Sequence, residues 1–572
     1  MCLWLTVINY RGGPVTATAS TPVVSDAAPA PMSRRATLNA ISGLILGMFV
    51  AILSGTVVST SLPRIISDLG GDQSSYTWVV TAALLATTVT TPIWGKFADL
   101  VNRKMLVQLA LGLFVLGSVL GGFAQDASML IGFRVIQGLG AGGLLALVQI
   151  VIADIISPRE RGRWMGLIGS VMAVATIGGP LIGGLVTDGI GWRANFFIAL
   201  PFAIAAIALI QATLHLPDRP KRAIKVDYFG AVLIATGVSL LLIWVTLGGS
   251  WFEWNSIESF VMIGGAVLAL VAAVVVELVV EEPIVPLSLF RNRTYALSVV
   301  ASLSVGVAMF GTTIFLAQYM QLARGATPTE SGLLTIPLIV GQMGSSIAAG
   351  QLISRYGRWK RYLVTGSVLA IAGLLLMSTL HYDTPYGFVA LFMFVLGAGL
   401  GMVMQNLVLV VQNDTPAAQL GAASSGVAFF RSLGGTAGVA VMGAVLGTRV
   451  ADLVREGLTG LAPEQLAGAQ ALADGGIPDL AELPGPVRTV VESAYGLGVA
   501  EVFLIAVPLA IVSLIAICFL PNKPLQTVTA AQRLAEEAEE AAVELADAEL
   551  GVVAEDPRDA GHDGRAGRTP TA

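Results

Sequence analysis

Apolar stretches of roughly twenty residues recur along this chain, and they limit what it can fold into. A helix needs about 20 consecutive apolar residues to cross a bilayer, whereas a strand of a membrane β-barrel alternates polar and apolar residues over about ten. The runs therefore predict helices near 39–62, 74–94, 105–124, 128–153, 165–187, 195–214, 229–248, 258–280, 295–319, 331–354, 362–380, 386–411, 420–447 and 497–520. This pattern indicates an all-α integral membrane protein with about fourteen transmembrane helices.

Composition excludes several classes of protein. Only 12% of the residues are charged and the mean hydropathy is +0.79, whereas soluble domains carry about 25% charge. The net charge of −5 arises from an acidic segment at 521–572, so no nucleic-acid partner is expected. Cys2 and Cys518 stand too far apart for a CxxC metal site. Neither a G-x-x-x-x-G-K-[ST] loop nor an H-E-x-x-H motif occurs. We therefore expect no enzyme activity, no metal and no cofactor.

The distribution of basic residues predicts the orientation in the membrane. If the N-terminus is cytoplasmic, twenty-four of the 32 Lys and Arg residues fall in inner segments and six in outer ones. Cytoplasmic loops of membrane proteins carry such an excess of positive charge. The sequence predicts a multi-pass protein of the cell membrane with both termini in the cytoplasm.

An internal repeat predicts how the helices are grouped. The segment GKFADLVNRK (95–104) is echoed by GQLISRYGRW (350–359). At about 30 residues per helix and loop, this offset corresponds to eight helices, which indicates two six-helix bundles with two accessory helices between them. The predicted regions are a disordered tail at 1–37, bundles at 38–215 and 286–520, accessory helices at 216–285 and an acidic cytoplasmic tail at 521–572. Within the second bundle, residues 448–496 are predicted to form a partly helical outer loop.

The repeated segment is the first candidate functional motif. It places an acid and several bases in one tight turn between helices, which can form a conformational latch, although inner loops are generally basic. The candidate latch residues are Gly95, Lys96, Asp99, Arg103, Lys104, Gly350 and Arg358.

A second motif, IGFRVIQGLGAGG (131–143), places Arg134 inside the fourth predicted span. A charge at this depth costs a few kcal/mol unless it meets a partner or water. Gln137 lies on the same helical face. Either a structural or a functional arginine therefore requires an acceptor nearby.

Two further sets of residues are weaker candidates. The segment GGPLIGG (178–184) suggests a flexible hinge at Gly179, Pro180, Gly183 and Gly184, and it is equally compatible with ordinary glycine-rich packing. Polar residues within spans could line an aqueous cavity, although Ser and Thr often bond their own backbone. These cavity candidates are Ser54, Thr56, Gln137, Gln405, Asn406 and Arg431.

From about Asn39 to Pro521 the chain resembles the major facilitator superfamily, in particular its fourteen-helix branch of drug:proton antiporters. The resemblance rests on the 95–104 loop, the arginine motif, GPLIGG, and the segments WRANFFIALP (192–201), VDYFGAVL (226–233), PIVPLSLFRNR (283–293) and GATPTESGLLTIP (325–337). It implies two bundles of inverted repeats around a substrate cavity that opens alternately to each side. It also implies that Asp99 and its basic neighbours latch the outward-facing state, that Arg134 takes part in proton coupling, and that Gly179 and Pro180 shape a hinge.

The first span departs from the family pattern. Members of this branch usually carry an aspartate where LSGTVVSTSLP (53–63) has Ser54. The acids in or near other spans are Asp68, Asp188, Glu277, Glu330 and Glu501, mostly at helix ends. Glu501 lies a turn inside the last span and is our first candidate for the proton site, ahead of Glu277 on an accessory helix. The alternative is that Glu501 is an interfacial carboxylate exposed to the outer solvent.

The expected function is proton-driven export of amphipathic, drug-like compounds by a protein that acts as a monomer. Its expected partners are a small-molecule substrate, protons and the lipid bilayer. Export of one endogenous metabolite, lipid or peptide is the alternative on the same fold, and a non-transporting membrane sensor is a second alternative.

Overall fold

The computed structural model describes residues 34–70, 73–214, 227–248, 252–280, 283–459, 484–529 and 532. Nearly all of the predicted disordered tail, the middle of the predicted outer loop and most of the acidic tail lie outside these residues. Within the described residues, 14 helices are long and apolar enough to cross a bilayer. The prediction of an all-α membrane protein with about fourteen spans is confirmed.

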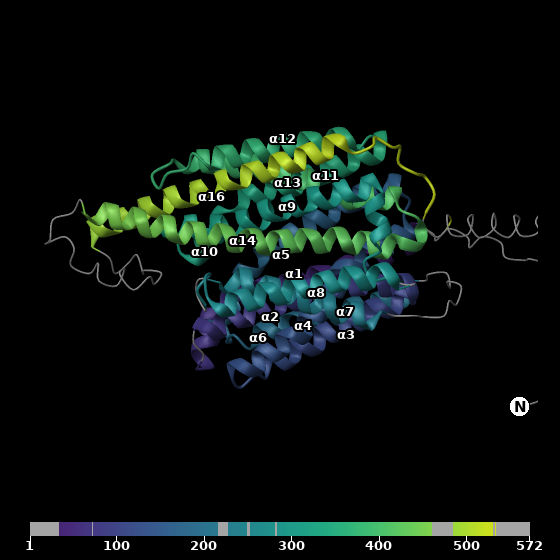
Figure 1. Cartoon of the computed structure of the whole chain (residues 1–572), viewed down its shortest axis with the longest axis horizontal. Coiled ribbons are helices and arrows are strands. Elements are labelled where there is room, and N and C mark those ends of the chain that lie inside the picture. Colours follow the sequence, from purple (N-terminus) through teal and green to yellow (C-terminus); the bar gives the residue numbers. More distant parts are fainter. Residues whose placement is uncertain are drawn as a thin grey trace, which may run out of the picture. The chain divides into compact units, whose positions relative to one another are not determined.

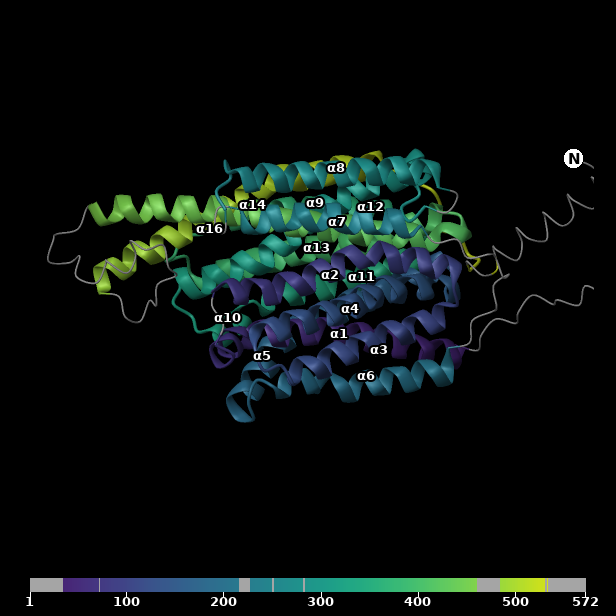
Figure 2. The same ribbon diagram turned by 60° about the horizontal axis from the view of Figure 1, so that its bottom comes forward.

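The first six helices form one bundle (Figures 1 and 2). Asn102 and Asp126 cap two of them, each accepting a backbone N–H of the first turn, and Pro158 stands in the first turn of another. An apolar core fills the space between these helices. They are α1 (Arg34–Asp68), α2 (Gln73–Leu100), α3 (Arg103–Gly122), α4 (Ala127–Ile155), α5 (Pro158–Gly189) and α6 (Ala194–Thr213).

The last six long helices form a second bundle with its own apolar core. A short helix, α10 (Pro328–Leu334), precedes the second of them, and a π-helical turn, η2 (Tyr319–Ala323), ends the first. The long helices are α9 (Arg293–Gln318), α11 (Ile336–Tyr356), α12 (Lys360–Met377), α13 (Tyr386–Asp414), α14 (Leu420–Thr459) and α16 (Gly485–Phe519).

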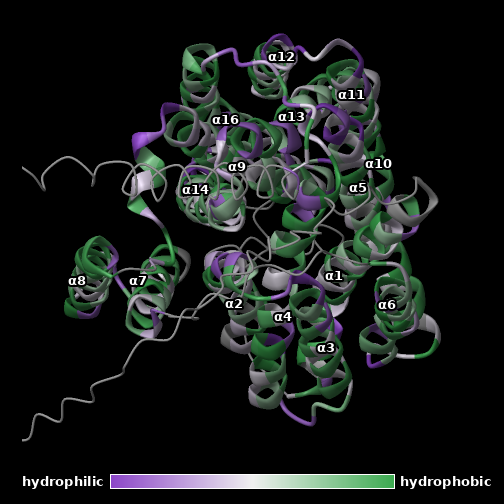
Figure 3. Ribbon diagram, turned by 90° about the vertical axis from the view of Figure 1, so that its right-hand side faces the viewer, coloured by the Kyte–Doolittle hydropathy of each residue, from purple (hydrophilic) through white to green (hydrophobic). Residues whose placement is uncertain are grey.

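Two accessory helices, α7 (Tyr228–Leu247) and α8 (Ile257–Val279), pack against each other between the bundles in chain order. Figure 3 shows α7 next to α2 and α14, with α8 on the outer side of α7. Val238 of α7 packs in one apolar cluster with Val89 of α2 and Phe429 of α14. Most apolar side chains of α8 are exposed, as expected of a helix that faces lipid. The accessory pair therefore packs against the interface between the two bundles at α2 and α14.

The structure changes the boundaries of the predicted outer loop. Helix α14 continues to Thr459 and α16 begins at Gly485, directly after Pro484. Figure 1 shows these two helices extending past their neighbours. The ion pairs Arg455–Asp452 and Arg488–Glu492 lie in these extensions. A loop boundary set by the end of the apolar run misses helical turns that continue on polar side chains.

Candidate functional site

The repeated segments and the start of α5 lie together at one end of the bundles, which we name the basic end. Asp99, at the end of α2, accepts the backbone N–H groups of Gly421 and Ala422 at the start of α14, each at 2.9 Å. The first N–H groups of a helix have no partner within it, and they carry partial positive charge. The carboxylate of Asp99 therefore binds the second bundle through a helix N-terminus.

Arg103 holds that carboxylate in place. Its side chain is 1% exposed; it pairs with Asp99 at 3.2 Å and also with Asp154 at the end of α4. Its Nε donates to the carbonyl of Ala98 at 2.8 Å. A buried charge requires such compensation. Two of the predicted latch residues, Asp99 and Arg103, are thus in contact, and Asp154 is a third member of this cluster that the sequence did not reveal.

Close helix contacts surround this ion pair. A Cβ atom on Gly95 would lie 2.8 Å from the carbonyl oxygen of Gly421 and would overlap the hydroxyl of Ser425. Only a residue without a side chain fits there. The α2–α14 contact is therefore made backbone to backbone at Gly95.

A second contact between the bundles joins α5 and α11 at the same end. A Cβ atom on Gly162 would lie 2.9 Å from the carbonyl oxygen of Gly350, and one on Gly350 would overlap that of Gly162. Ser354 accepts the N–H of Arg163 at 3.0 Å and donates to the carbonyl of Glu160 at 3.3 Å. Ser354 stands four residues after Gly350, as Asp99 does after Gly95. Aligning the two repeated segments residue by residue would have identified it.

The other basic residues predicted for the latch are not part of the contact between Asp99 and α14. Lys104 donates to the carbonyl of Gln211 in α6 at 2.9 Å, within its own bundle. Lys96 is buried, within electrostatic range of Glu277 of α8. Arg358 is exposed, unlike Arg103 at the corresponding position of the repeat.

A buried arginine that the sequence did not single out also joins the bundles. Arg161 of α5 is fully buried and donates to the side-chain oxygen of Gln412 in α13 at 2.7 Å and to the carbonyls of Ala153 and Ile156, each at 2.8 Å. The amide of Gln412 donates in turn to Ser424 of α14 at 2.9 Å. In the sequence, Arg161 resembles any basic residue of an inner loop, so no signal distinguished it.

Near the opposite end, the structure brings together three predicted residues. Arg134 of α4 donates to the side-chain oxygen of Gln137 at 2.6 Å, and the amide of Gln137 donates to the hydroxyl of Ser54 in α1 at 3.1 Å. All three side chains are buried, and Arg134 also contacts the carbonyl of Val79 in α2. The acceptors of Arg134 are thus an amide and a carbonyl, and the network ends at the hydroxyl of Ser54.

Part of the predicted hinge packs against α1. A Cβ atom on Gly179 would overlap the hydroxyl of Thr56, and one on Gly183 would lie 2.8 Å from the carbonyl oxygen of Val57. Thr56 donates to the carbonyls of Leu53 and Ala175, so its hydroxyl is directed to backbone. Gly184 has open space around it. Pro180 lies within α5, and its side chain is outside the described set.

The remaining cavity candidates are buried and only partly satisfied. Gln405 of α13 donates to the sulfur of Met172 in α5 at 3.1 Å, and Asn406 donates to the carbonyl of Met402 at 2.7 Å. Among the described residues, the side-chain oxygens of both amides and Nη1 of Arg431 have no hydrogen-bond partner. Buried polar atoms of this kind are unusual, and Gln405 lies at the contact between the bundles.

Glu501 lies apart from the Arg134 network. Its carboxylate is 43% exposed and pairs with Arg449 of α14 at 2.8 Å. Glu277, in contrast, is 6% exposed and accepts the N–H groups of Ile284 and Val285, each at 3.2 Å. Glu501 belongs to a bundle helix, but its carboxylate pairs with Arg449 and not with Arg134, the other residue predicted to take part in proton coupling.

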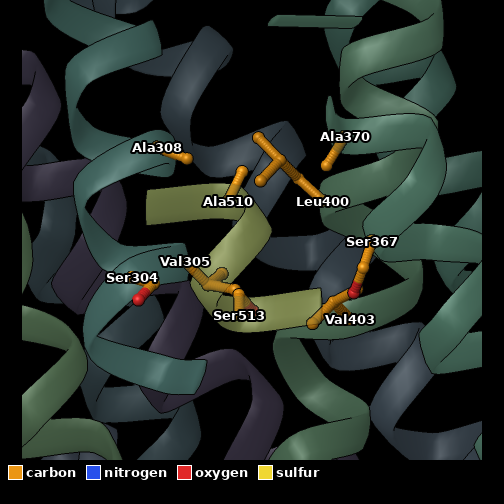
Figure 4. A pocket seen from close by; sticks show the side chains of 9 residues that line it. All are labelled: Ser304, Val305, Ala308, Ser367, Ala370, Leu400, Val403, Ala510 and Ser513. Carbon is orange, nitrogen blue, oxygen red and sulfur yellow. The ribbon is translucent and has the colours of Figure 1, made fainter. Parts of the chain in front are cut away.

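A small pocket lies inside the second bundle, between α9, α12, α13 and α16 (Figure 4). Its hydroxyl groups, from Ser304, Ser367 and Ser513, donate to helix backbone carbonyls. The rest of its lining is Val, Ala and Leu, so it offers little polar recognition. No group of three or more metal-ligating side chains occurs among the described residues.

Comparisons with known proteins agree with this architecture. The family model of the Major Facilitator Superfamily matches residues 44–439. Over 418 residues the chain is 35% identical to the multidrug transporter protein MdtP of Bacillus subtilis, covering 73% of this chain and 77% of MdtP. It is 28% identical to multidrug resistance protein 3 of the same organism over 495 residues, 85% of this chain and 96% of that protein. The structure of the human organic anion transporter MFSD10 aligns with a TM-score of 0.55 at 14% identity, over 83% of this chain and 99% of that one.

Proposed function

Because the chain belongs to the Major Facilitator Superfamily, we propose that it exports amphipathic organic compounds across the cell membrane by proton antiport, with alternating access. The names of the relatives MdtP and multidrug resistance protein 3 support a drug-like substrate class. The basic end would face the cytoplasm, as the excess of Lys and Arg in its loops favours.

The contact between Asp99 and the start of α14 carries this proposal. It consists of two hydrogen bonds that join different bundles and that break when the bundles separate at this end. Hydrogen bonds to a charged group contribute about 1.5–3 kcal/mol each, and about 1.4 kcal/mol changes an equilibrium tenfold. The latch is therefore strong enough to favour the closed basic end and weak enough to be released during a transport cycle.

Proton coupling requires a group that titrates. Arg134, Gln137 and Ser54 do not change charge near neutral pH, so we assign Arg134 a fixed positive charge in the transport path and the proton to a carboxylate elsewhere. Glu501 is suited to this role because its protonation would break the ion pair with Arg449 of α14. Asp99 binds the other end of the same helix, at Gly421. A proton on Glu501 would thus loosen the helix that carries the latch.

An efflux assay tests the proposed function. The full chain is expressed in a bacterial strain that lacks other drug pumps, and the accumulation of fluorescent amphipathic cations and neutral dyes is measured with and without a protonophore. We expect lower accumulation in cells that carry the protein, and we expect the protonophore to abolish the difference. An Arg134→Ala variant at equal abundance serves as the control for passive effects of overexpression.

The outcomes separate the candidates. Export of several unrelated compounds that depends on the proton gradient supports the proposal. Export that persists without the gradient contradicts antiport. If no compound of the panel is exported and the pure protein in liposomes takes up none of them under an imposed pH gradient, the drug-like substrate class is wrong.

A further inference from the structure

The residues directly after the last helix lie across the basic end. Trp359, at the start of α12, donates from Nε1 to the carbonyl of Lys523 at 2.9 Å. Lys523 pairs with Asp414, at the end of α13, at 2.5 Å. Leu525 is buried. Figure 1 shows this segment, in yellow, running from α16 along the end at which α14 begins. We name residues 521–526 the strap.

Asn413 of α13 binds the strap through both atoms of its amide. Its nitrogen donates to the carbonyl of Pro524 at 3.1 Å, and its oxygen accepts the N–H of Gln526 at 2.9 Å. The Asn413 side chain is buried. One buried amide thus pairs with both a donor and an acceptor of the strap backbone, the two kinds of group that backbone offers. The second bundle thus has a specific site for a peptide segment.

The strap also reaches the first bundle. The N–H of Arg159, in the first turn of α5, donates to the carbonyl of Gln526 at 3.1 Å. Ser157 is the N-cap residue of this helix, and its side chain makes no capping hydrogen bond. The strap therefore supplies an acceptor for a first-turn N–H group that the cap side chain does not bind. The strap is therefore held by both bundles at once.

Comparison of the two halves shows what the strap replaces. Asp154 and Asn413 each stand eight residues before a glycine of a contact between bundles, Gly162 and Gly421. Asp154 receives the guanidinium of Arg103. Arg358, which corresponds to Arg103, is exposed, and Asn413 receives the strap instead. By this spacing Asn413 corresponds to Asp154, and it binds peptide backbone where Asp154 binds an arginine side chain.

We propose that the strap is an intramolecular ligand that closes the basic end, and that it leaves Arg159 while staying on Asn413 when this end opens. Three contacts, to Trp359, Asn413 and Asp414, tie it to the second bundle, whereas one backbone hydrogen bond ties it to the first. The weaker attachment is the one that breaks. This inference rests on the proposed alternation of access but not on the substrate or on protons.

Cysteine labelling tests the inference in the full chain without substrate. In a background with Cys2→Ser and Cys518→Ser, Ser346→Cys reports opening, because Ser346 is buried at the α5–α11 contact beside Gly166. A membrane-impermeant maleimide is applied from the basic side in liposomes. Asn413→Ala frees the strap and so removes its hydrogen bond to Arg159, which is the strap contact that the proposal breaks on opening. The labelling rate should therefore rise by roughly two- to tenfold, the ratio expected for the loss of one net hydrogen bond from the closed arrangement.

Two further variants make the result decisive. Leu525→Ser alters only the strap and should also raise labelling several-fold, so the test stands if Asn413→Ala does not fold. Gln108→Ala removes an exposed amide that bonds Gln211 within the first bundle and should leave the rate unchanged. Unchanged labelling in Leu525→Ser, with the protein folded, overturns the proposal even if export is normal.

Cross-linking tests where the strap detaches. A short bis-methanethiosulfonate reagent, which forms a disulfide with each of two cysteines by displacing sulfinate, is applied to one of two cysteine pairs. The pair Arg159→Cys and Gln526→Cys joins the strap to the first bundle, and the pair Asp414→Cys and Lys523→Cys joins it to the second. The first link should block labelling at position 346, and the second should leave it near the uncross-linked rate. Any other pattern overturns the proposed order of detachment. A chain that exports none of the tested compounds can still give the expected pattern, so this inference and the proposed function fail separately.

Discussion

At the scale of single residues, the proposed latch depends on the charge of Asp99, which is buried and compensated by several partners. Asp99 accepts two backbone N–H groups and pairs with Arg103, and Arg103 pairs in turn with Asp154. Ser354 occupies the corresponding position in the second half with a neutral hydroxyl, which makes one accepted and one donated hydrogen bond. The two halves therefore hold the same end closed with different strength, and the α2–α14 side is the stronger.

Asp99→Asn should impair export more than Ser354→Ala. The asparagine side chain keeps one acceptor oxygen, loses the charge and leaves Arg103 with one carboxylate fewer, at a cost of about 3–5 kcal/mol when a buried pair is broken. Loss of the serine hydroxyl removes neutral hydrogen bonds of about 1 kcal/mol each. Initial export rates at equal abundance measure the difference. Equal losses in the two variants would contradict the assigned strengths.

Arg134→Ala should abolish coupled export and leave the amount of protein in the membrane near normal, because the loss of a buried charge lowers the cost of insertion while it removes the partner of Gln137. Arg134→Lys should restore export only in part, since lysine lacks the planar fork that reaches both Gln137 and Val79. Dye efflux and immunoblotting of membranes measure both quantities. Full export by the alanine variant would show that the charge is not used.

At the scale of helices, hydropathy predicts the spans, because each must fill the hydrocarbon core with apolar side chains. It does not predict where a helix ends in water, and α14 and α16 continue past the apolar runs for that reason. Hydropathy also does not predict which residues contact each other across the bundles. Asp99 and Gly421 are far apart in the sequence, and only the internal repeat indicates that the two halves pack together. Arg134 and Gln137 were predicted together because one helix face carries both, whereas the placement of Glu501 required the packing of α16.

Gly350→Ala should weaken closure of the basic end. The new Cβ atom would overlap the carbonyl of Gly162 and force α5 and α11 apart, at a cost of about 1–3 kcal/mol to the closed arrangement. Gly344→Ala in the same helix is the matched control, since nothing lies within 4 Å of a Cβ atom there. We expect export by the Gly350 variant to fall about tenfold and the control to export normally. Similar export by both would mean that the contact does not limit the cycle.

Glu501→Gln should reduce proton-dependent export more than Glu277→Gln. Glutamine at 501 mimics the protonated acid and loosens Arg449 permanently. Glutamine at 277 keeps one acceptor for the loop N–H groups of Ile284 and Val285 and should mainly lower protein abundance. Export per molecule is measured at several imposed pH gradients. A defect in the Glu277 variant alone would place the proton on the accessory helix.

At the scale of the whole membrane domain, the contacts at the basic end connect the two bundles to each other and to the strap. Asp99 joins α2 to α14, Ser354 joins α11 to α5, and Arg161 joins α5 to α13. The accessory pair packs along the α2–α14 line, and α7 contacts both helices. Opening of this end must therefore break these three contacts and, under our proposal, the bond between Gln526 of the strap and Arg159. A membrane potential supplies about 2.3 kcal/mol per charge per 100 mV toward that work.

The orientation of the domain decides which side the closed end blocks, and it can be measured directly. Twenty-four Lys and Arg residues in inner segments against six in outer ones favour a cytoplasmic basic end. Reporter fusions after residues 225 and 525 should both be active as cytoplasmic reporters, and a fusion after residue 470 should be active as an external one. The first two sites lie on either side of an even number of spans, so they must agree whatever the absolute orientation. If they agree and both are external, the latch at Asp99 closes the outer side and the proposed direction of export is reversed; if they disagree, the fourteen-span topology is wrong.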